Sequence, residues 1–304
     1  MRGEPSQTAE AVCWMRATDQ RHKPADRIVD DPYAKFFLGP MLRAALATWE
    51  ASGQLGDLAE RFAPGLVAFV LCRHRYIDDC LRRALARTVE QVVILGAGYD
   101  MRAYRFANEL KHRPVFEVDH PATSRRKARI LAAHTSDLPA ADVRMVEVDF
   151  QKDSLRDRLQ ESGFQQGMRT FYVWEGVAMY LGRDAVKKTL AELREISAAG
   201  SEIAMDLWQI PEGSDLVSAA HRLSANALYL IGEPVTFAIH PEDAGAFLNR
   251  LGYRVLEIAE APTLQSRYIR DRRPVYAPAY LVHASTRRTR SASQAATATE
   301  PATA

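Results

Sequence analysis

Two glycines that follow a short apolar run form the first candidate ligand site in the sequence. In VVILGAGYD (Val92 to Asp100), a β-branched run typical of a strand leads directly into Gly96 and Gly98. Glycine reaches positive φ without strain and lets a ligand approach the backbone closely, while a helix that follows directs N–H groups at an anionic group. The spacing predicts a binding loop, with a plain tight turn as the alternative. A dinucleotide fingerprint needs a third glycine where this chain has Met101.

Acidic residues end the next two predicted strands. Asp119 ends the strand Val115–Asp119, about twenty residues after the glycines, where a carboxylate can accept both hydroxyl protons of a ribose. The alternative is a helix cap, because Pro121 opens the next predicted helix. Asp149 ends the third strand, where its carboxylate can accept from an adenine amine while Phe150 covers the ring. For this pair the alternative is a strand-end turn with the phenylalanine in the core.

A glutamate and an arginine lie in apolar surroundings, and each needs a partner of opposite charge. Glu175 interrupts the apolar stretch FYVWEGVAMYL at the end of the strand Thr170–Trp174. Because a buried unpaired carboxylate is costly, we expect beside it either a ligand cation, an ammonium or a sulfonium, or an arginine. Arg73 falls on the apolar stripe of the helix expected over Gly65–Arg87, as a candidate to bind a ligand carboxylate unless it extends to solvent. Tyr180 lies just beyond the glutamate, where a substrate is expected.

An alternation of strands and helices must position these residues. The first five expected strands alternate with helical segments such as Asp184–Ala199, which predicts right-handed crossovers and a mainly parallel, doubly wound α/β sheet. The last two expected strands have a shorter connection and are predicted to form an antiparallel pair at one sheet edge. The expected strands are Val89–Leu95, Val115–Asp119, Met145–Asp149, Thr170–Trp174, Glu202–Leu207, Arg254–Ala259 and Tyr280–His283.

The chain is expected to form one domain over residues 1–286. About the first 88 residues precede the first strand and have helical patterns, so we expect them to cap the open end of the sheet. Residues 287–304 are small and polar without apolar periodicity, which predicts a disordered tail.

Composition excludes several classes of protein. The 304 residues carry a formal net charge of +2, without the basic face of a nucleic-acid-binding protein. No apolar stretch approaches the roughly 18 residues of a membrane span, and the N-terminus has no signal-peptide core, so we expect a cytoplasmic protein without a membrane partner. The three cysteines show no C-x-x-C spacing, so neither a disulfide framework nor a bound metal is expected. A monomer or a homodimer is expected.

Taken together, these segments resemble the leucine carboxyl methyltransferase-like family, which includes phosphatase carboxyl methyltransferases and bacterial enzymes that tailor polyketides. The resemblance spans roughly residues 10–285 and implies a seven-stranded methyltransferase sheet with S-adenosylmethionine as methyl donor. The stretches that carry it are DDPYAKFF (Asp30 to Phe37), CRHRYIDD (Cys72 to Asp79), LGAGYDMRAYRF (Leu95 to Phe106), FEVDHP (Phe116 to Pro121), VDF (Val148 to Phe150) and WEGVAMYL (Trp174 to Leu181).

The resemblance also implies roles for individual residues. Two of them face the methyl acceptor: Tyr180 lines the acceptor pocket, and Arg16 matches a basic residue that holds the acceptor. The others bind the methyl donor: Arg73 its carboxylate, Gly96 and Gly98 as the glycine loop, Asp119 its ribose, Asp149 and Phe150 its adenine, and Glu175 its methionine part.

The chemistry expected is in-line transfer of a methyl group to an oxygen of a small natural-product-like molecule. A carboxylate acceptor is ionised at neutral pH and needs no general base, whereas a phenol does. No histidine–aspartate cluster is evident for that purpose, so a carboxylate acceptor is favoured and a phenol is the alternative. Two other classes remain open: an NAD(P)-dependent oxidoreductase, disfavoured by Met101, and a module that binds the cofactor without catalysis.

Overall fold

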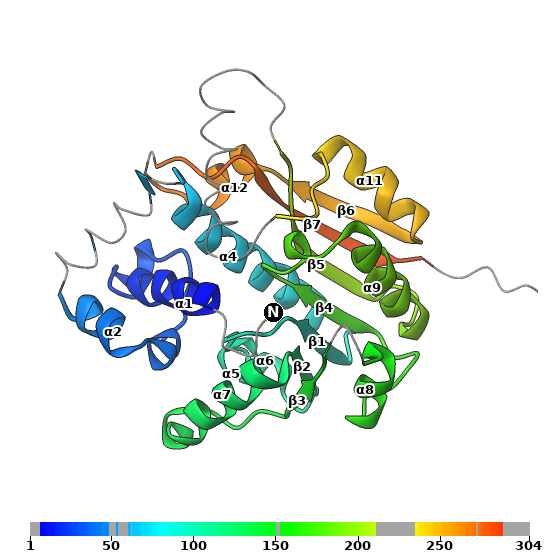
Figure 1. The fold of residues 1–304 in the computed structure, drawn as a ribbon, viewed down its shortest axis with the longest axis horizontal. Helices are drawn as coiled ribbons and strands as arrows, with labels where there is room; N and C mark the ends of the chain where they lie inside the picture. The colour runs from blue at the N-terminus through cyan, green and yellow to red at the C-terminus, as the bar shows by residue number, and fades with distance from the viewer. Residues whose placement is uncertain are drawn as a thin grey trace, which may run out of the picture.

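A computed structural model describes residues 7–48, 53, 60–61, 63–149, 153–210, 235–271 and 273–287 of the chain. Within them a seven-stranded sheet runs in the order β3-β2-β1-β4-β5-β7-β6 (Figure 1). Strands β1 to β5 are mutually parallel, and β7 pairs antiparallel with both of its neighbours. The predicted doubly wound sheet with an antiparallel edge is therefore confirmed. The strands are β1 (Gln91–Leu95), β2 (Val115–Asp119), β3 (Val143–Glu147), β4 (Thr170–Trp174), β5 (Glu202–Trp208), β6 (Tyr253–Ala259) and β7 (Ala279–Thr286).

The strand ends that carry the candidate acids agree with the sequence in two cases and differ in a third. The predicted bounds of β2 and β4 are those observed, whereas β3 begins and ends two residues before the expected Met145–Asp149. The reason lies in the register: β3 pairs with β2 from Val143 opposite Val115 to Glu147 opposite Asp119. The last bond to β2 is from Val148 N–H to the carbonyl oxygen of Asp119 at 2.9 Å, so Asp149 lies after the strand and not at its end.

Helices cover both faces of the sheet (Figure 1). Successive side chains of a strand point to opposite faces, so Val92 and Ile94 of β1 join one core cluster while Val93 and Leu95 join the other. The first cluster includes side chains of α4, α5, α6 and α12, and the second includes those of α8, α9 and α11. The helices are α1 (Gln7–Asp19), α2 (Pro40–Ala47), α4 (Leu66–Leu85), α5 (Arg102–Arg105), α6 (Ala107–Leu110), α7 (Pro121–Ala132), α8 (Leu155–Glu161), α9 (Arg183–Ile196), α11 (Pro241–Arg250) and α12 (Ala261–Tyr268), with 3-10 helices η1 (Pro24–Asp26), η2 (Ala34–Phe37), η3 (Thr135–Asp137) and η4 (Ala178–Tyr180).

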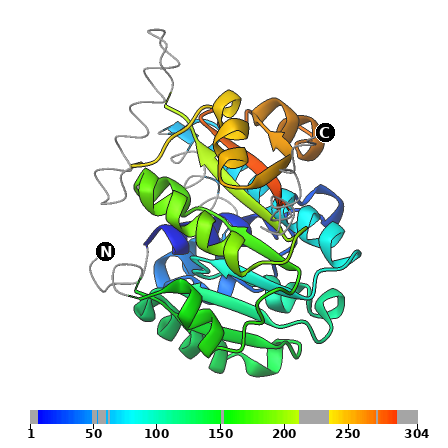
Figure 2. The same cartoon turned by 90° about the vertical axis from the view of Figure 1, so that its right-hand side faces the viewer.

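The expected cap over about residues 1–88 is wrong for its longest helix. Helix α4 packs against β4, β5 and β7 and forms part of the helical layer on one face of the sheet (Figures 1 and 2). Its residues are buried on several sides, as a helix between a sheet and further helices requires. Helix α1, in contrast, contacts the turn after β1, since Arg16 donates to the carbonyl oxygen of Tyr99 at 2.9 Å. Of these two helices, the covering role therefore falls to α1.

Some expectations from the sequence concern residues that the structure does not describe. Residues 288–304 of the expected tail lie outside the described ranges, as does Phe150. Among the helices that are described, none is both long enough and apolar enough to cross a lipid bilayer.

An ion pair between β5 and β7 gives the fold a dependence on pH. Glu202 accepts from His283 Nε2 at 2.7 Å and pairs with Arg87 at 3.2 Å. Burial alone would raise the pKa of this carboxyl, but His283 and Arg87 outweigh it and hold the pKa below the ordinary 4.5. We expect Glu202→Gln to lower the free energy of unfolding at neutral pH. The difference from the wild type should shrink as the pH falls below about 4.5, because acid removes the stabilising charge from the wild type only.

Urea titrations of both proteins at roughly pH 7, 5 and 3 measure this difference. A gap in the free energy of unfolding that stays constant or widens on acidification would contradict the assigned ion pair.

Candidate functional site

The turn after β1 is held in a conformation that suits glycine. Gly96 and Gly98 have φ of +63° and +48°, which side-chain-bearing residues rarely adopt. A Cβ at Gly96 would also lie 2.3 Å from Cγ2 of Val177, in the turn that follows β4. Gly96 therefore lets the turns after β1 and β4 pack closely together at the carboxyl ends of the strands.

Asp119 braces this glycine turn from the neighbouring strand. One carboxylate oxygen accepts from the backbone N–H of Gly98 at 2.5 Å, and the other accepts from the N–H of His120 at 2.6 Å. The N-cap of α7 is His120, whose Nδ1 accepts from Ala122 N–H at 3.3 Å, so Asp119 is not the helix cap that the sequence left open. Burial raises the pKa of Asp119, and its two backbone bonds act in the opposite direction.

Arg73 and Glu175 meet directly beside the glycine turn. Arg73 is only 4% exposed, which excludes extension to solvent, and its Nε lies 3.1 Å from Glu175 Oε1. Its Nη1 lies 3.3 Å from Asp206 Oδ2, and Asp206 also accepts from Gly176 N–H at 2.6 Å. An arginine is thus the partner of Glu175 in this structure, one of the two alternatives that the sequence raised.

Sequence reasoning missed Arg102, which pairs with three carboxylates in the same buried region. Its Nε lies 2.7 Å from Asp78 Oδ1, and its Nη1 lies 2.8 Å from Glu175 Oε2 and also contacts Asp100. Asp78 further pairs with Arg105 at 2.5 Å. Two signals in the sequence pointed to this network. One is the spacing Asp100-x-Arg102 after the glycine turn, and the other is CRHRYIDD, in which opposite charges lie one helical turn apart.

The arginines keep these buried carboxylates ionised. Burial alone would raise the pKa of Glu175, but Arg102, His74 and Arg73 outweigh it and hold the pKa well below the ordinary value. Burial likewise opposes ionisation of Asp78, where Arg105 and Arg102 lower the pKa. The charges of Glu175 and Asp78 are thus already in place at neutral pH.

One subset of the buried groups has the spacing of a metal site. Ligand atoms of His74, Asp100 and Glu175 lie within 4.8 Å of one another. The guanidinium of Arg102 already contacts both carboxylates of this subset. A fixed cation therefore takes the position that a metal ion would need, and the donor set is better explained as an arginine site.

The remaining candidate residues differ in how they relate to these buried ion pairs. Tyr180 is the last residue of η4 and packs, partly buried, against the first core cluster. Arg16 is 3% exposed, with Nη1 3.3 Å from Asp31 and 3.4 Å from His74 Nε2, so it joins the same network from α1. Asp149 is partly exposed, and its backbone N–H donates to Asp153 at 2.9 Å.

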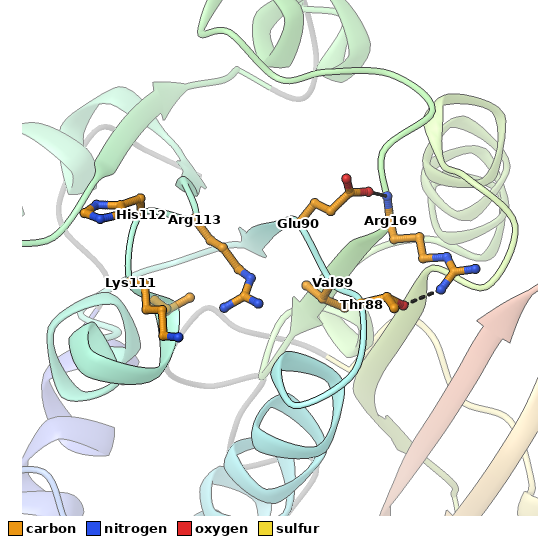
Figure 3. A pocket seen from close by; sticks show the side chains of 8 residues that line it. Thr88, Val89, Glu90, Lys111, His112, Arg113 and Arg169 are labelled. Atoms are coloured by element: carbon orange, nitrogen blue, oxygen red, sulfur yellow. Dashed lines mark hydrogen bonds between the residues drawn. The ribbon is translucent and has the colours of Figure 1, made fainter.

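A hollow at the amino ends of the strands, opposite to the residues described above, is basic but has a structural explanation. It has a volume of about 700 Å³, and Figure 3 shows Lys111 and Arg113 on one side of it and Arg169 on the other. Helices α4 and α6 end here, where unpaired carbonyl groups attract cations. Arg113 donates to two such carbonyl oxygens, at 3.0 and 3.5 Å. Ligands of open α/β sheets bind at the other, carboxyl edge, where the charged cluster lies.

Comparisons with known proteins identify relatives of this chain by sequence and by structure. The family described as leucine carboxyl methyltransferase matches residues 9–194. A protein of Saccharopolyspora erythraea assigned as an S-adenosyl-L-methionine-dependent methyltransferase is 34% identical over 253 residues, which cover 82% of this chain and 83% of that protein. A protein of Parafrankia sp. with the same assignment is 34% identical over 200 residues, 66% of this chain and 62% of that one. A solved DUF574 family protein from Streptomyces avermitilis shares the fold, with a TM-score of 0.57, 15% identity and coverage of 90% and 96%.

Proposed function

Because this chain belongs to the leucine carboxyl methyltransferase family, as an S-adenosylmethionine-dependent methyltransferase, we propose that it methylates a carboxylate oxygen of a small natural-product-like acid. The observation that carries the carboxylate assignment is Arg16. Its side chain is 3% exposed, and its Nε has no hydrogen-bond partner among the described residues. A buried guanidinium with one N–H to spare is suited to an anionic oxygen.

The residues at the carboxyl edge fit the methyl donor in charge. Four arginines and five carboxylates, Glu175 among them, form one charged cluster, which leaves an excess of one negative charge. S-adenosylmethionine carries an ammonium, a sulfonium and a carboxylate, and therefore one net positive charge. The cluster consists of Arg16, Arg73, Arg102 and Arg105 with Asp31, Asp78, Asp100, Glu175 and Asp206.

Individual groups of the cluster match the two ends of the methyl donor. Arg73 would hold the carboxylate, while Glu175 and Asp206, both now on its guanidinium, would hold the ammonium and sulfonium. Asp119 and the Gly98 N–H would bind the ribose, one strand away. Asp149, just after β3, would accept from the adenine amine, with Phe150 beside it in the sequence.

The chain's own part in the reaction is binding, alignment and exclusion of water. The methyl donor supplies an electrophilic methyl group on a positively charged sulfur. Glu175 fixes the cationic end of the methyl donor. Arg16 and Tyr180 orient the acceptor oxygen in line with the bond between the methyl carbon and the sulfur. An ionised carboxylate needs no proton removed at neutral pH, so positioning alone suffices for this acceptor.

A methylation assay tests the proposal. Matched pairs of a small aromatic acid and the corresponding phenol are incubated with the enzyme and isotopically labelled S-adenosylmethionine. We expect label in the acids, in a form that mild base releases because the product is an ester. Label confined to the phenols, in a base-stable ether, would replace the carboxyl assignment by phenolic O-methylation. Label in neither, while calorimetry detects binding of S-adenosylmethionine, would reject both acceptor classes.

A further inference from the structure

His74 is a buried side chain at the centre of the charged cluster. It lies on α4, is 1% exposed, and contacts charged side chains from α1, from α5 and from the turn after β4. The charged groups that face its ring are Arg16, Asp78, Asp100, Arg102, Arg105 and Glu175. None of the roles assigned above, in binding the methyl donor or the acceptor, uses His74.

The contacts of the ring define which nitrogen carries the proton. Nε2 lies 2.7 Å from Arg105 Nη1 and 3.4 Å from Arg16 Nη1. Guanidinium groups only donate, so Nε2 must accept and bears no proton. Nδ1 lies 3.1 and 3.2 Å from the two oxygens of Glu175, which only accept, so Nδ1–H donates to that carboxylate.

A third arginine, which lies beside Nδ1, does not change this assignment. Arg102 Nη2 lies 3.0 Å from Nδ1, but it also lies 3.0 Å from the carbonyl oxygen of His74 and can donate there. Burial lowers the pKa of His74, and Arg102 adds to the effect, while Glu175 and Asp78 act in the opposite direction. A proton added at Nε2 would face Arg105 and Arg16 directly, so the neutral ring is the form that fits.

We infer that His74 is a positioning residue whose neutral Nδ1–H aims the carboxylate of Glu175 while leaving its negative charge for the cationic end of the methyl donor. The inference rests on the proposed function, because that function assigns the cationic end of the methyl donor as the ligand of Glu175. An imidazolium at this place would cancel the single excess negative charge of the cluster. A neutral donor orients the carboxylate without that cost.

The tautomer of His74 provides a test that does not depend on activity. In wild-type protein with ¹⁵N-labelled histidine, proton–nitrogen correlation spectra distinguish a protonated Nδ1 from a protonated Nε2. We expect a neutral ring with Nδ1 protonated, unchanged between about pH 6 and 8, although free histidine titrates near 6.5. The signal is assigned by its loss in His74→Asn. A protonated Nε2, or a ring that titrates in this range, would overturn the inference.

Two substitutions test the hydrogen bond itself by calorimetry with S-adenosylmethionine. In His74→Asn the amide N–H can take the place of Nδ1–H, so the Kd should stay within about threefold of the wild type. In His74→Leu no donor remains, and the Kd should rise about tenfold or more, as for the loss of a hydrogen bond to a charged group. Equal affinity of the leucine variant and the wild type would refute the role.

His112→Asn is the matched control, because this histidine is exposed at the opposite edge of the sheet. It should change neither the His74 signal nor the Kd. A wild-type protein that fails to bind S-adenosylmethionine would refute the proposed function. If the wild type binds S-adenosylmethionine but the asparagine variant binds it as weakly as the leucine variant, only the role of His74 is refuted.

Discussion

Replacing Arg102 with methionine is expected to lower the free energy of unfolding by about 3 to 5 kcal/mol, as for removal of one partner from a buried ion pair. The side chain of Arg102 is 1% exposed and contacts Asp78, Asp100 and Glu175. Methionine has a similar length but no charge, so the variant leaves three buried carboxylates with fewer cations. Those groups must then take up protons or draw in water, and both cost stability.

Urea denaturation at neutral pH measures this effect, and Arg125→Met is the matched control. Arg125 also pairs with a carboxylate, that of Glu147 at 3.0 Å, but its side chain is 69% exposed. Water solvates both charges there, so the control should leave the free energy of unfolding nearly unchanged. Equal losses in the two variants would show that burial of the Arg102 network does not govern its contribution.

The cluster around Glu175 links the stability of the fold to the chemistry of the site. The same arginines that keep Glu175 ionised also hold it in place, through contacts of 2.8 and 3.1 Å. Such a carboxylate stays charged and oriented before any ligand arrives, which spares the cost of reorganisation. If the methyl donor's carboxylate binds to Arg73 as we propose, Arg73 must exchange a carboxylate partner. The free energy of binding would then be set by a difference between two ion pairs.

Much of the fold was predictable from the sequence, because strand patterns and turn residues are local signals. The bounds of β2 and β4 follow from β-branched and aromatic runs, of which one ends at Asp119 and the other is followed by Glu175. The antiparallel edge pair follows from its short connection. The β3 strand was displaced by two residues, because its ends depend on which residues of β2 remain to pair with. Helix α4 was assigned to a cap, because an apolar stripe shows that a helix is buried but not against what.

The candidate site was predictable residue by residue but not as a network. Glu175 was identified because an acid in an apolar run needs a partner, and the sequence left open whether that partner is a ligand or an arginine. Asp206 lies within an equally apolar strand, so the same reasoning applied to β5 would have found it. Arg102 is separated from Asp78 by 24 residues, and no periodicity relates the two. Pairings of this kind depend on how helices pack, which is a tertiary property.

Asp119→Ala is expected to weaken binding of S-adenosylmethionine about 100-fold, roughly 3 kcal/mol, as for the loss of two hydrogen bonds to a charged group. The proposal gives the carboxylate two tasks. It is to accept from the ribose hydroxyls, and it holds the Gly98 N–H at 2.5 Å. Alanine removes both, so the glycine turn loses its brace and the ribose its acceptor. Calorimetry with S-adenosylmethionine measures the Kd.

The control is Glu147→Ala, because Glu147 is the residue of β3 that pairs in register with Asp119. It is also an acid at the carboxyl end of a parallel strand, but its carboxylate pairs with the exposed Arg125. The Kd of this control should stay within about twofold of the wild type, because an exposed ion pair contributes little. If both alanine variants weaken binding equally, a carboxylate at the carboxyl ends of these strands acts only through its negative charge. Asp119 then makes no specific contact with the ribose. If neither does, the ribose lies elsewhere, because a bond to a charged acceptor cannot be lost without effect.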